Sequence, residues 1–294
     1  MKTCIKIIVL SIFTFNTALN FKCFAKIECI NRTEPKAITI ETVGKGLPIL
    51  FLPGFATPGS VFKDTANHIN TAHSSLFVSY AGFNGHAPIE MPWYDTIKKA
   101  IIAYITTEKL NNVIIIGHSM GGNLAVDIAA ALPNTISKII IVDALPCMRE
   151  VMMPQVPAEH FYYESPYNTQ MLNMEVDQFK SMAKMMAMNM TINTDNQDAI
   201  TNWMINADRK TWVYGYTDLL KLDLRPTLKD VSCETLILGA SFPDVIVAKQ
   251  NYEKQYANLT NKTIQMASNS KHFVMFDQPE WFYKSVNDFL VDEN

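Results

Sequence analysis

The chain has 294 residues, of which 48% are hydrophobic and 18% charged, and its formal net charge at pH 7 is -3. This composition suffices to bury one large core and argues against a low-complexity or disordered chain. Because the charge leaves no basic surplus to neutralise a phosphate backbone, we expect no nucleic-acid partner.

The first 25 residues have the three-part layout of a secretory signal. Lys2 and Lys6 precede an apolar stretch over residues 7–19, and Cys23-Phe24-Ala25 supplies the small residue before a cleavage site. This pattern predicts a signal peptide at 1–25, cleavage after Ala25, and an exported protein, either periplasmic or secreted. The alternative is an uncleaved anchor, which needs about 18 or more nearly uninterrupted apolar residues. We therefore expect no stable membrane span after cleavage.

The cysteines that follow the predicted signal do not form a disulfide framework. Cys29, Cys147 and Cys233 are an odd and widely scattered set, and they have no metal-ligand spacing. They can form at most one disulfide bond, and the sequence leaves open whether they do. The pattern predicts no metal site.

Short apolar runs separated by helical patterns follow along the chain. Residues 36–43 alternate as a half-buried strand, and continuous apolar runs then occur at 49–52, 76–78, 113–116, 139–142 and 236–238. Fully apolar strands that alternate with helices are typical of a parallel sheet covered on both faces. Ligands of such sheets bind at the carboxyl ends of the strands. The sequence therefore predicts an α/β fold with its site at that edge.

A candidate nucleophile lies directly behind the run at 113–116. Gly117-His118-Ser119-Met120-Gly121-Gly122 matches G-x-S-x-G, in which glycines permit a tight strand-to-helix turn that exposes the serine hydroxyl. The following helix, over 123–132, points its positive dipole end at developing negative charge. Because the pattern also arises by chance, the glycine-rich turn without any chemistry is the alternative.

Residues 146–216 break the alternation of strands and helices. They contain no apolar strand run, and Val176, Phe179, Met182, Met186 and Met190 recur at helical spacing. We predict a helical cap over 146–216 on a core formed by 26–145 and 217–294. Methionines beside Phe161, Tyr162, Tyr163 and Trp203 would line an adaptable apolar pocket, although ordinary helical core is the simpler explanation for any single methionine.

The order of these parts resembles the α/β-hydrolase superfamily, in particular its serine esterase- and lipase-like members with a helical cap. The resemblance extends from about residue 38 to 290. It is carried by the blocks at 52–55, 117–122, 141–143, 236–239 and 271–273. The resemblance implies a mostly parallel sheet flanked by helices, a serine nucleophile, an acid on a strand end, and a histidine base late in the chain. His272 has that late position, after the expected last strand at 263–266.

Two aspartates compete for the role of the acid. Asp244 follows the run at 236–238, as in many relatives, but it lies two residues further from Gly239 than usual. Asp143 ends the run at 139–142, where some family members carry their acid. Either carboxylate can fix the tautomer of the imidazole. We favour Asp244 on the sequence alone.

The resemblance also implies an oxyanion hole made of two backbone amides, from Met120 and from the loop after 49–52, where we choose Phe55. The predicted activity is hydrolysis of a small-molecule carboxylic ester, with an apolar acyl or aryl group, through an acyl-serine intermediate. No metal or organic cofactor is implied. Thioester or amide cleavage and acyl transfer on the same residues remain alternatives, as does a non-catalytic ligand-binding member of the fold.

Overall fold

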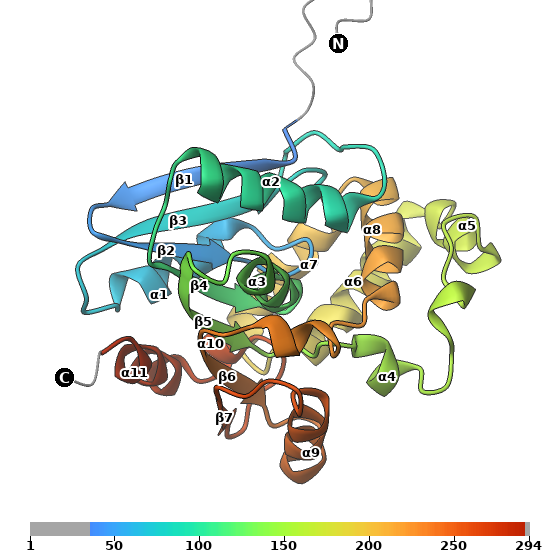
Figure 1. The fold of residues 1–294 in the computed structure, drawn as a ribbon. Coiled ribbons are helices and arrows are strands. Elements are labelled where there is room, and N and C mark those ends of the chain that lie inside the picture. Colours follow the sequence, from blue (N-terminus) through green and yellow to red (C-terminus); the bar gives the residue numbers. More distant parts are fainter. Residues whose placement is uncertain (1–35, 292–294) are drawn as a thin grey trace, which may run out of the picture. The chain divides into compact units, whose positions relative to one another are not determined.

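A mostly parallel seven-stranded sheet runs through residues 36–291, the part of the chain that this computed structural model describes (Figure 1). The strand order is β1-β3-β2-β4-β5-β6-β7; β1 is antiparallel to β3, and the other neighbours are parallel. The strands are β1 (Ile38–Gly44), β2 (Leu47–Leu52), β3 (His73–Tyr80), β4 (Val113–His118), β5 (Ile136–Val142), β6 (Glu234–Ala240) and β7 (Lys262–Ala267). The predicted fold class is confirmed.

Helices connect the strands and cover both faces of the sheet. They are α1 (Lys63–Asn67), α2 (Trp93–Thr107), α3 (Met120–Ala131), α4 (Met148–Met152), α5 (Pro166–Leu172), α6 (Val176–Met190), α7 (Thr194–Ile205), α8 (Arg209–Lys221), α9 (Val245–Gln255), α10 (Val274–Asp277) and α11 (Pro279–Leu290). The short 3₁₀ helices are η1 (Gly59–Phe62), η2 (Ala158–His160) and η3 (Thr227–Asp230).

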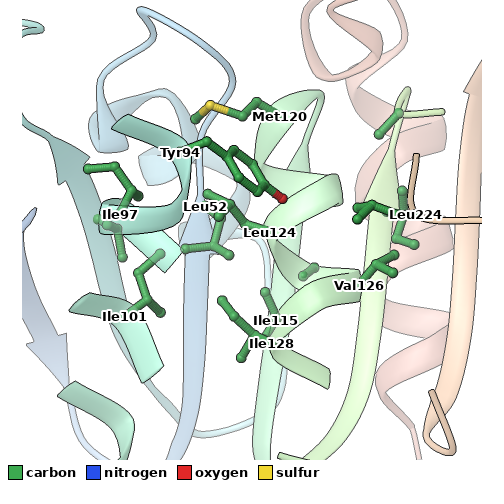
Figure 2. Packing of buried hydrophobic residues seen from close by; sticks show 14 of the residues in the cluster. Leu52, Tyr94, Ile97, Ile101, Ile115, Met120, Leu124, Val126, Ile128 and Leu224 are labelled. Carbon is green, nitrogen blue, oxygen red and sulfur yellow. The ribbon is translucent and has the colours of Figure 1, made fainter. Parts of the chain in front are cut away.

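The alternation of side chains along β2 shows how the sheet is buried on both faces. Leu50 and Leu52 pack into a cluster with α2 and α3, part of which Figure 2 shows. Ile49 and Phe51 point to the opposite face and belong to a cluster that includes side chains of α11. Successive side chains of a strand point to opposite faces, so a strand buried on both faces must be apolar throughout. This requirement explains the continuous apolar runs of the sequence.

The central strands end side by side at one edge of the sheet. Leu52 pairs with Gly117, and His118 with Val142, so β2, β4 and β5 end in register. Val142 in turn pairs with Leu238, and β6 pairs with β7 up to its last residue. The turns that follow these strands contain every residue of the candidate site.

The helices α4 to α8 are inserted between β5 and β6 (Figure 1). This insertion contains the segment 146–216 that the sequence predicts as a cap, but the expected boundary at 216 falls inside α8, which continues to Lys221. The predicted signal peptide at 1–25 lies outside the described residues. Among the residues that are described, no helix combines the length and apolar character that crossing a membrane requires.

The thiols of Cys147 and Cys233 are both free, the first buried and the second partly so. Cys29 lies outside the described residues. Within residues 36–291, no three His, Cys, Asp or Glu side chains are grouped in a way that could hold a metal ion.

Candidate active site

Ser119 occupies a strained turn between β4 and α3. Its backbone has φ 54° and ψ -124°, a conformation that non-glycine residues rarely adopt and that costs about 1–3 kcal/mol. A Cβ at Gly117 would lie 2.2 Å from the Gly121 carbonyl oxygen, and one at Gly121 would lie 1.9 Å from the Leu52 carbonyl oxygen. Both positions therefore require glycine. The turn holds the serine at the edge where the parallel strands end.

Backbone hydrogen bonds fix this turn on the sheet. The Ser119 amide donates to the Val142 carbonyl over 2.8 Å, which extends the pairing of β4 and β5 by one residue. The Gly122 amide donates to the Ser119 carbonyl over 2.8 Å and starts α3. Because the first amides of a helix lack partners within the helix, the start of α3 directs positive partial charge toward the serine.

His272, in the turn between β7 and α10, is paired with Asp143. The His272 Nδ1 lies 2.6 Å from the Asp143 Oδ2, at the end of β5. The other carboxylate oxygen, Oδ1, accepts from the Ala240 amide at 2.9 Å and from the Tyr252 hydroxyl at 2.5 Å. The acid is thus held from β6, from α9 and from the histidine itself.

These contacts determine the ionisation of Asp143. Burial raises the pKa of this carboxyl, but the hydrogen bond and charge of His272, together with the hydrogen bonds from Tyr252 and the Ala240 amide, outweigh burial and lower it below the usual range. Asp143 is therefore a carboxylate at neutral pH. Because a carboxylate only accepts, His272 carries its proton on Nδ1, and Nε2 is left to accept a proton.

The structure corrects the preference for Asp244. Its Oδ1 accepts hydrogen bonds from the amides of Ile246 and Val247, each at 2.9 Å, and the residue is the exposed N-cap of α9. Ser241, Phe242 and Pro243 separate it from β6, so the carboxylate lies at the start of α9 and binds the free amides there. Asp143 follows its strand immediately, and its own amide donates to the Leu238 carbonyl over 2.8 Å.

His118, which precedes the serine, has a role that the sequence did not reveal. Its Nε2 donates to the backbone carbonyl of His272 over 2.9 Å. Burial is the main cause that lowers the pKa of His118 to about 3, so the ring is neutral. Its buried Nδ1 has no hydrogen-bond partner among the described residues. The hydrogen bond from His118 therefore links the end of β4, directly before Ser119, to the turn that contains His272.

Tyr252 was also missed, because the position of a tyrosine on a helix does not indicate which turn its hydroxyl reaches. It is almost completely buried, and a Cβ on Gly239 would lie 2.5 Å from its ring. Burial is the main cause that raises the pKa of Tyr252 well above its usual value, followed by the charge of Asp143. The phenol therefore stays protonated and donates to the acid.

The two amides expected to form an oxyanion hole lie in the turns after β2 and β4. Met120 is the first residue of α3, where an amide has no partner within its own helix, and Phe55 lines the cavity beside Ser119. The loop of Phe55 is rigid, because its ring packs edge-on against Phe83 and Trp93, with centroid distances of 4.9 and 5.6 Å. The Thr57 amide also closes the turn on the Gly54 carbonyl at 3.1 Å.

An apolar cavity of about 510 Å³ lies over these turns and contains Ser119 and His272 in its wall. Its roof comes from the inserted helices and includes Met148, Met186, Met190, Trp203, Met204 and Tyr216. Of the aromatic residues expected there, Trp203 contributes, whereas Phe161, Tyr162 and Tyr163 are not part of the wall. Among the described lining residues, Asp143 is the only carboxylate, and no Lys or Arg is present. The site therefore suits an uncharged, apolar group.

The G-x-S-x-G turn at the end of a central parallel strand is the arrangement of the α/β-hydrolase fold. The sequence profile of the alpha/beta hydrolase family matches residues 49–285. The chain belongs to this family.

Curated relatives extend over most of the chain. The sn-1-specific diacylglycerol lipase ABHD11 of Danio rerio is 24% identical over 267 residues, covering 84% of this chain and 79% of that protein. A putative esterase/lipase of Haemophilus influenzae is 24% identical over 208 residues, covering 67% of each chain. Among solved structures, an esterase from Exiguobacterium antarcticum superposes with a TM-score of 0.69 at 20% identity, covering 87% of this chain and 98% of that one. The chain thus resembles esterase- and lipase-like members of its family.

Proposed function

We propose that this protein hydrolyses carboxylic esters through an acyl intermediate on Ser119. The observation that carries the proposal is the 2.6 Å contact between His272 Nδ1 and Asp143 Oδ2, at the same sheet edge as the strained serine. This contact leaves His272 Nε2 as the available base. A glycine-rich turn without chemistry has no need of a paired histidine and carboxylate beside it. The esterase and lipase relatives support the same conclusion.

The proposed reaction has two halves. The Nε2 of His272 takes the proton of Ser119 as its Oγ attacks the ester carbonyl, and the resulting imidazolium gives that proton to the departing alkoxide. Water then attacks the acyl-serine, with His272 again accepting and returning a proton. The products are a carboxylic acid and an alcohol. Asp143 keeps Nδ1 protonated throughout and stabilises the imidazolium.

The amides of Phe55 and Met120 would hold the oxyanion in both halves. Met120 is the first residue of α3, where an amide has no partner within its own helix, and Phe55 lies in the turn after β2. Donors fixed before the reaction need no reorganisation as charge develops, and one such donor contributes about 2.7–4 kcal/mol in a well-studied protease. We further propose an acyl or aryl group without charge, because no Lys or Arg of the described residues lines the cavity.

The proposal is tested by intact mass after exposure to a fluorophosphonate probe. We expect one adduct on the wild type and none on Ser119→Ala. Ser181→Ala is the control and should carry one adduct, because Ser181 is an exposed serine of α6 whose hydroxyl donates to the Asp177 carbonyl. Activity on soluble esters should vanish with Ser119→Ala to within a small residual rate. A folded wild type that takes up no probe and cleaves no ester would refute the proposal.

We also propose that the protein is exported and that its mature form begins after Ala25, on the basis of the lysines, apolar stretch and small residue in 1–25. The same mass spectrum of the protein recovered outside the cytoplasm gives the position of the cut. A chain that keeps residue 1 and stays in the cytoplasm would contradict this.

A further inference from the structure

The cavity opens to solvent between two apolar lips. Val151 and Met152 at the end of α4 line the cavity and yet are 41% and 54% exposed. Phe242 and Val247, from the turn after β6 and the start of α9, also line it and are 54% and 52% exposed. A side chain that both lines a cavity and is half exposed lies at its opening. These four residues, together with Pro243 and Asn189, which also line the cavity and are exposed, therefore mark the mouth.

The exposed apolar surface continues beyond the cavity wall. Val245 and Ile246, in the first turn of α9, do not line the cavity but are 45% and 65% exposed. We call the six residues Val151, Met152, Phe242, Val245, Ile246 and Val247 the apolar rim. Exposed apolar residues scattered singly need no explanation, whereas a continuous group around a site marks an interaction surface.

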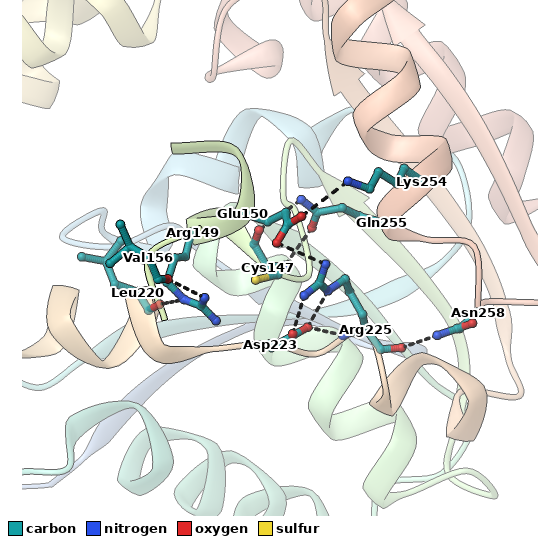
Figure 3. A network of polar contacts seen from close by, with 10 residues as sticks. All are labelled: Cys147, Arg149, Glu150, Val156, Leu220, Asp223, Arg225, Lys254, Gln255 and Asn258. Atoms are coloured by element: carbon teal, nitrogen blue, oxygen red, sulfur yellow. Dashed lines mark hydrogen bonds and ion pairs between the residues drawn. The ribbon is translucent and has the colours of Figure 1, made fainter. Parts of the chain in front are cut away.

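A polar network joins α4 to the far end of α9, the two helices that carry rim residues (Figure 3). Cys147, just before α4, exchanges two hydrogen bonds with the Gln255 side chain at the end of α9, at 2.9 and 3.1 Å. Glu150 of α4 accepts from Lys254 of α9 at 3.4 Å and pairs with Arg225 at 3.5 Å. These contacts set the position of α4 relative to α9, and so of the two elements that carry the rim.

Individual rim residues are also held in place. The hydroxyl of Tyr216, in the cavity wall, donates to the Met152 sulfur at 3.7 Å. The amide of Phe242 donates to the Ser270 carbonyl at 3.1 Å, and the Lys271 ammonium lies 5.4 Å from the centre of the Phe242 ring. Large apolar side chains are therefore kept at the solvent boundary although the adjoining cavity is itself apolar.

From this geometry we propose that the apolar rim docks onto the surface of aggregated neutral or zwitterionic lipid, so that an acyl chain passes from the aggregate directly into the cavity. This inference rests on the proposed ester hydrolysis and names its substrate class, the esters of lipid aggregates. The continuity of rim and cavity carries it, because an acyl chain that leaves an aggregate through this mouth meets apolar surface along the whole path.

The charges around the rim favour uncharged lipid over anionic lipid. Lys254 is paired with Glu150, and Lys249 lies 3.8 Å from Glu253. The Lys271 ammonium, which donates to the Met188 carbonyl, is a single cation beside Phe242, and the exposed Asp244 carboxylate lies in the same segment. The chain as a whole has a formal net charge of -3. Attraction by an anionic surface needs a cluster of free cations. Docking here is therefore driven by burial of apolar side chains and should persist in high salt.

The test is flotation of the mature Ser119→Ala protein with phosphatidylcholine vesicles that contain diacylglycerol, because the inactive variant leaves the lipid intact. We expect flotation with little dependence on salt. Ile246→Ser and Ile246→Asp should lower the partition coefficient about tenfold or more, in line with the loss of one buried isoleucine. Val43→Asp is the matched control, since Val43 is 52% exposed but lies on β1 at the opposite edge of the sheet.

Catalysis separates this inference from the proposed function. In the active protein, Ile246→Ser should leave kcat/KM for a soluble short-chain ester unchanged and lower the rate on diacylglycerol in vesicles about tenfold. If the soluble ester is not cleaved, the proposed function fails, while flotation still tests the rim. The docking inference is overturned if the protein with an intact rim does not float with the vesicles, or if its Ile246 variants float equally well. It is also overturned if binding requires anionic lipid and vanishes in high salt. A dimer in sedimentation that Ile246→Asp dissociates would assign the rim to a second copy of the chain and overturn it as well.

Discussion

The turn after β5 and the turn after β6 both follow a buried parallel strand, and both carry an aspartate. Asp143 comes immediately after β5, is buried, and contacts His272; Asp244 comes four residues after β6, is exposed, and caps α9. In this chain, the aspartate that follows its strand at once stays at the site edge, and the one that lies further along the turn does not. A few residues further on, the free amides at the start of a helix bind it instead.

The largest expected effect tests the comparison directly. Asp143→Asn should lower kcat for a soluble ester about 10³- to 10⁴-fold, because an amide donor facing Nδ1 favours the wrong tautomer of His272, as in the serine proteases. Asp244→Asn is the matched control, since asparagine caps helices as well as aspartate does, and its activity should stay within about twofold. Steady-state kinetics on folded variants measures both. If Asp244→Asn is the inactive variant and Asp143→Asn is active, Asp244 and not Asp143 is the acid.

A second prediction concerns the base rather than the acid. His118→Met fills the buried site without a donor for the His272 carbonyl, so the base loses its tie to β4, and we expect kcat to fall about tenfold. His118→Gln keeps a donor and should recover most of the activity. Because His118 is neutral, with a pKa of about 3, neither change alters the charge of the site at working pH. If His118→Met and His118→Gln lost the same share of kcat, His118 would act by packing and not through its hydrogen bond.

A third prediction removes the phenol that holds the acid. Tyr252→Phe should lower kcat several-fold and reduce the free energy of unfolding at neutral pH by about 1.5–3 kcal/mol, the contribution of a hydrogen bond to a charged group. Chemical denaturation at neutral pH and kinetics on a soluble ester measure these effects. Tyr256→Phe is a control, because that hydroxyl donates to the Ala144 carbonyl and not to the acid.

The pH dependence of this loss has a definite sign. The pKa of Asp143 is lowered in the folded protein, so its stabilisation is fully present above the usual aspartate pKa of about 3.9 and is lost as the pH falls through the folded value. Without Tyr252 the pKa of Asp143 rises back toward the usual value, and less stabilisation is lost in acid. The gap in free energy of unfolding between wild type and Tyr252→Phe should therefore narrow below about pH 4. A gap that is constant with pH would mean that the phenol acts only by packing.

The sequence was sufficient for the features that follow from local pattern. The strand runs, the G-x-S-x-G turn around Ser119 and the late His272 depend on residues that are adjacent in the chain, and the structure brings the last two to one sheet edge. Sterics alone require glycine at 117 and 121, so the turn is readable without knowing the rest of the fold.

The acid was not predictable in this way because its identity depends on distances across the sheet. Asp143 and His272 are 129 positions apart, and Tyr252 is 109 from Asp143. The N-cap pattern that decides the role of Asp244, an aspartate directly before Val245-Ile246-Val247, was nevertheless present in the sequence. The hydrogen bond from His118 to the His272 carbonyl cannot be inferred from residue types, because its acceptor is a backbone atom.

The smallest expected effect concerns Asp244 as a cap. Asp244→Ala removes the acceptor of the Ile246 and Val247 amides and should lower the free energy of unfolding by about 0.5–2 kcal/mol, with kcat for a soluble ester unchanged within about twofold. Denaturation at pH 7 measures the first quantity. Asp244→Asn, which keeps an acceptor, should regain most of the stability. If Asp244→Ala also weakened catalysis strongly, the cap would act on the site through α9 and Tyr252, and the two turns would be coupled rather than independent.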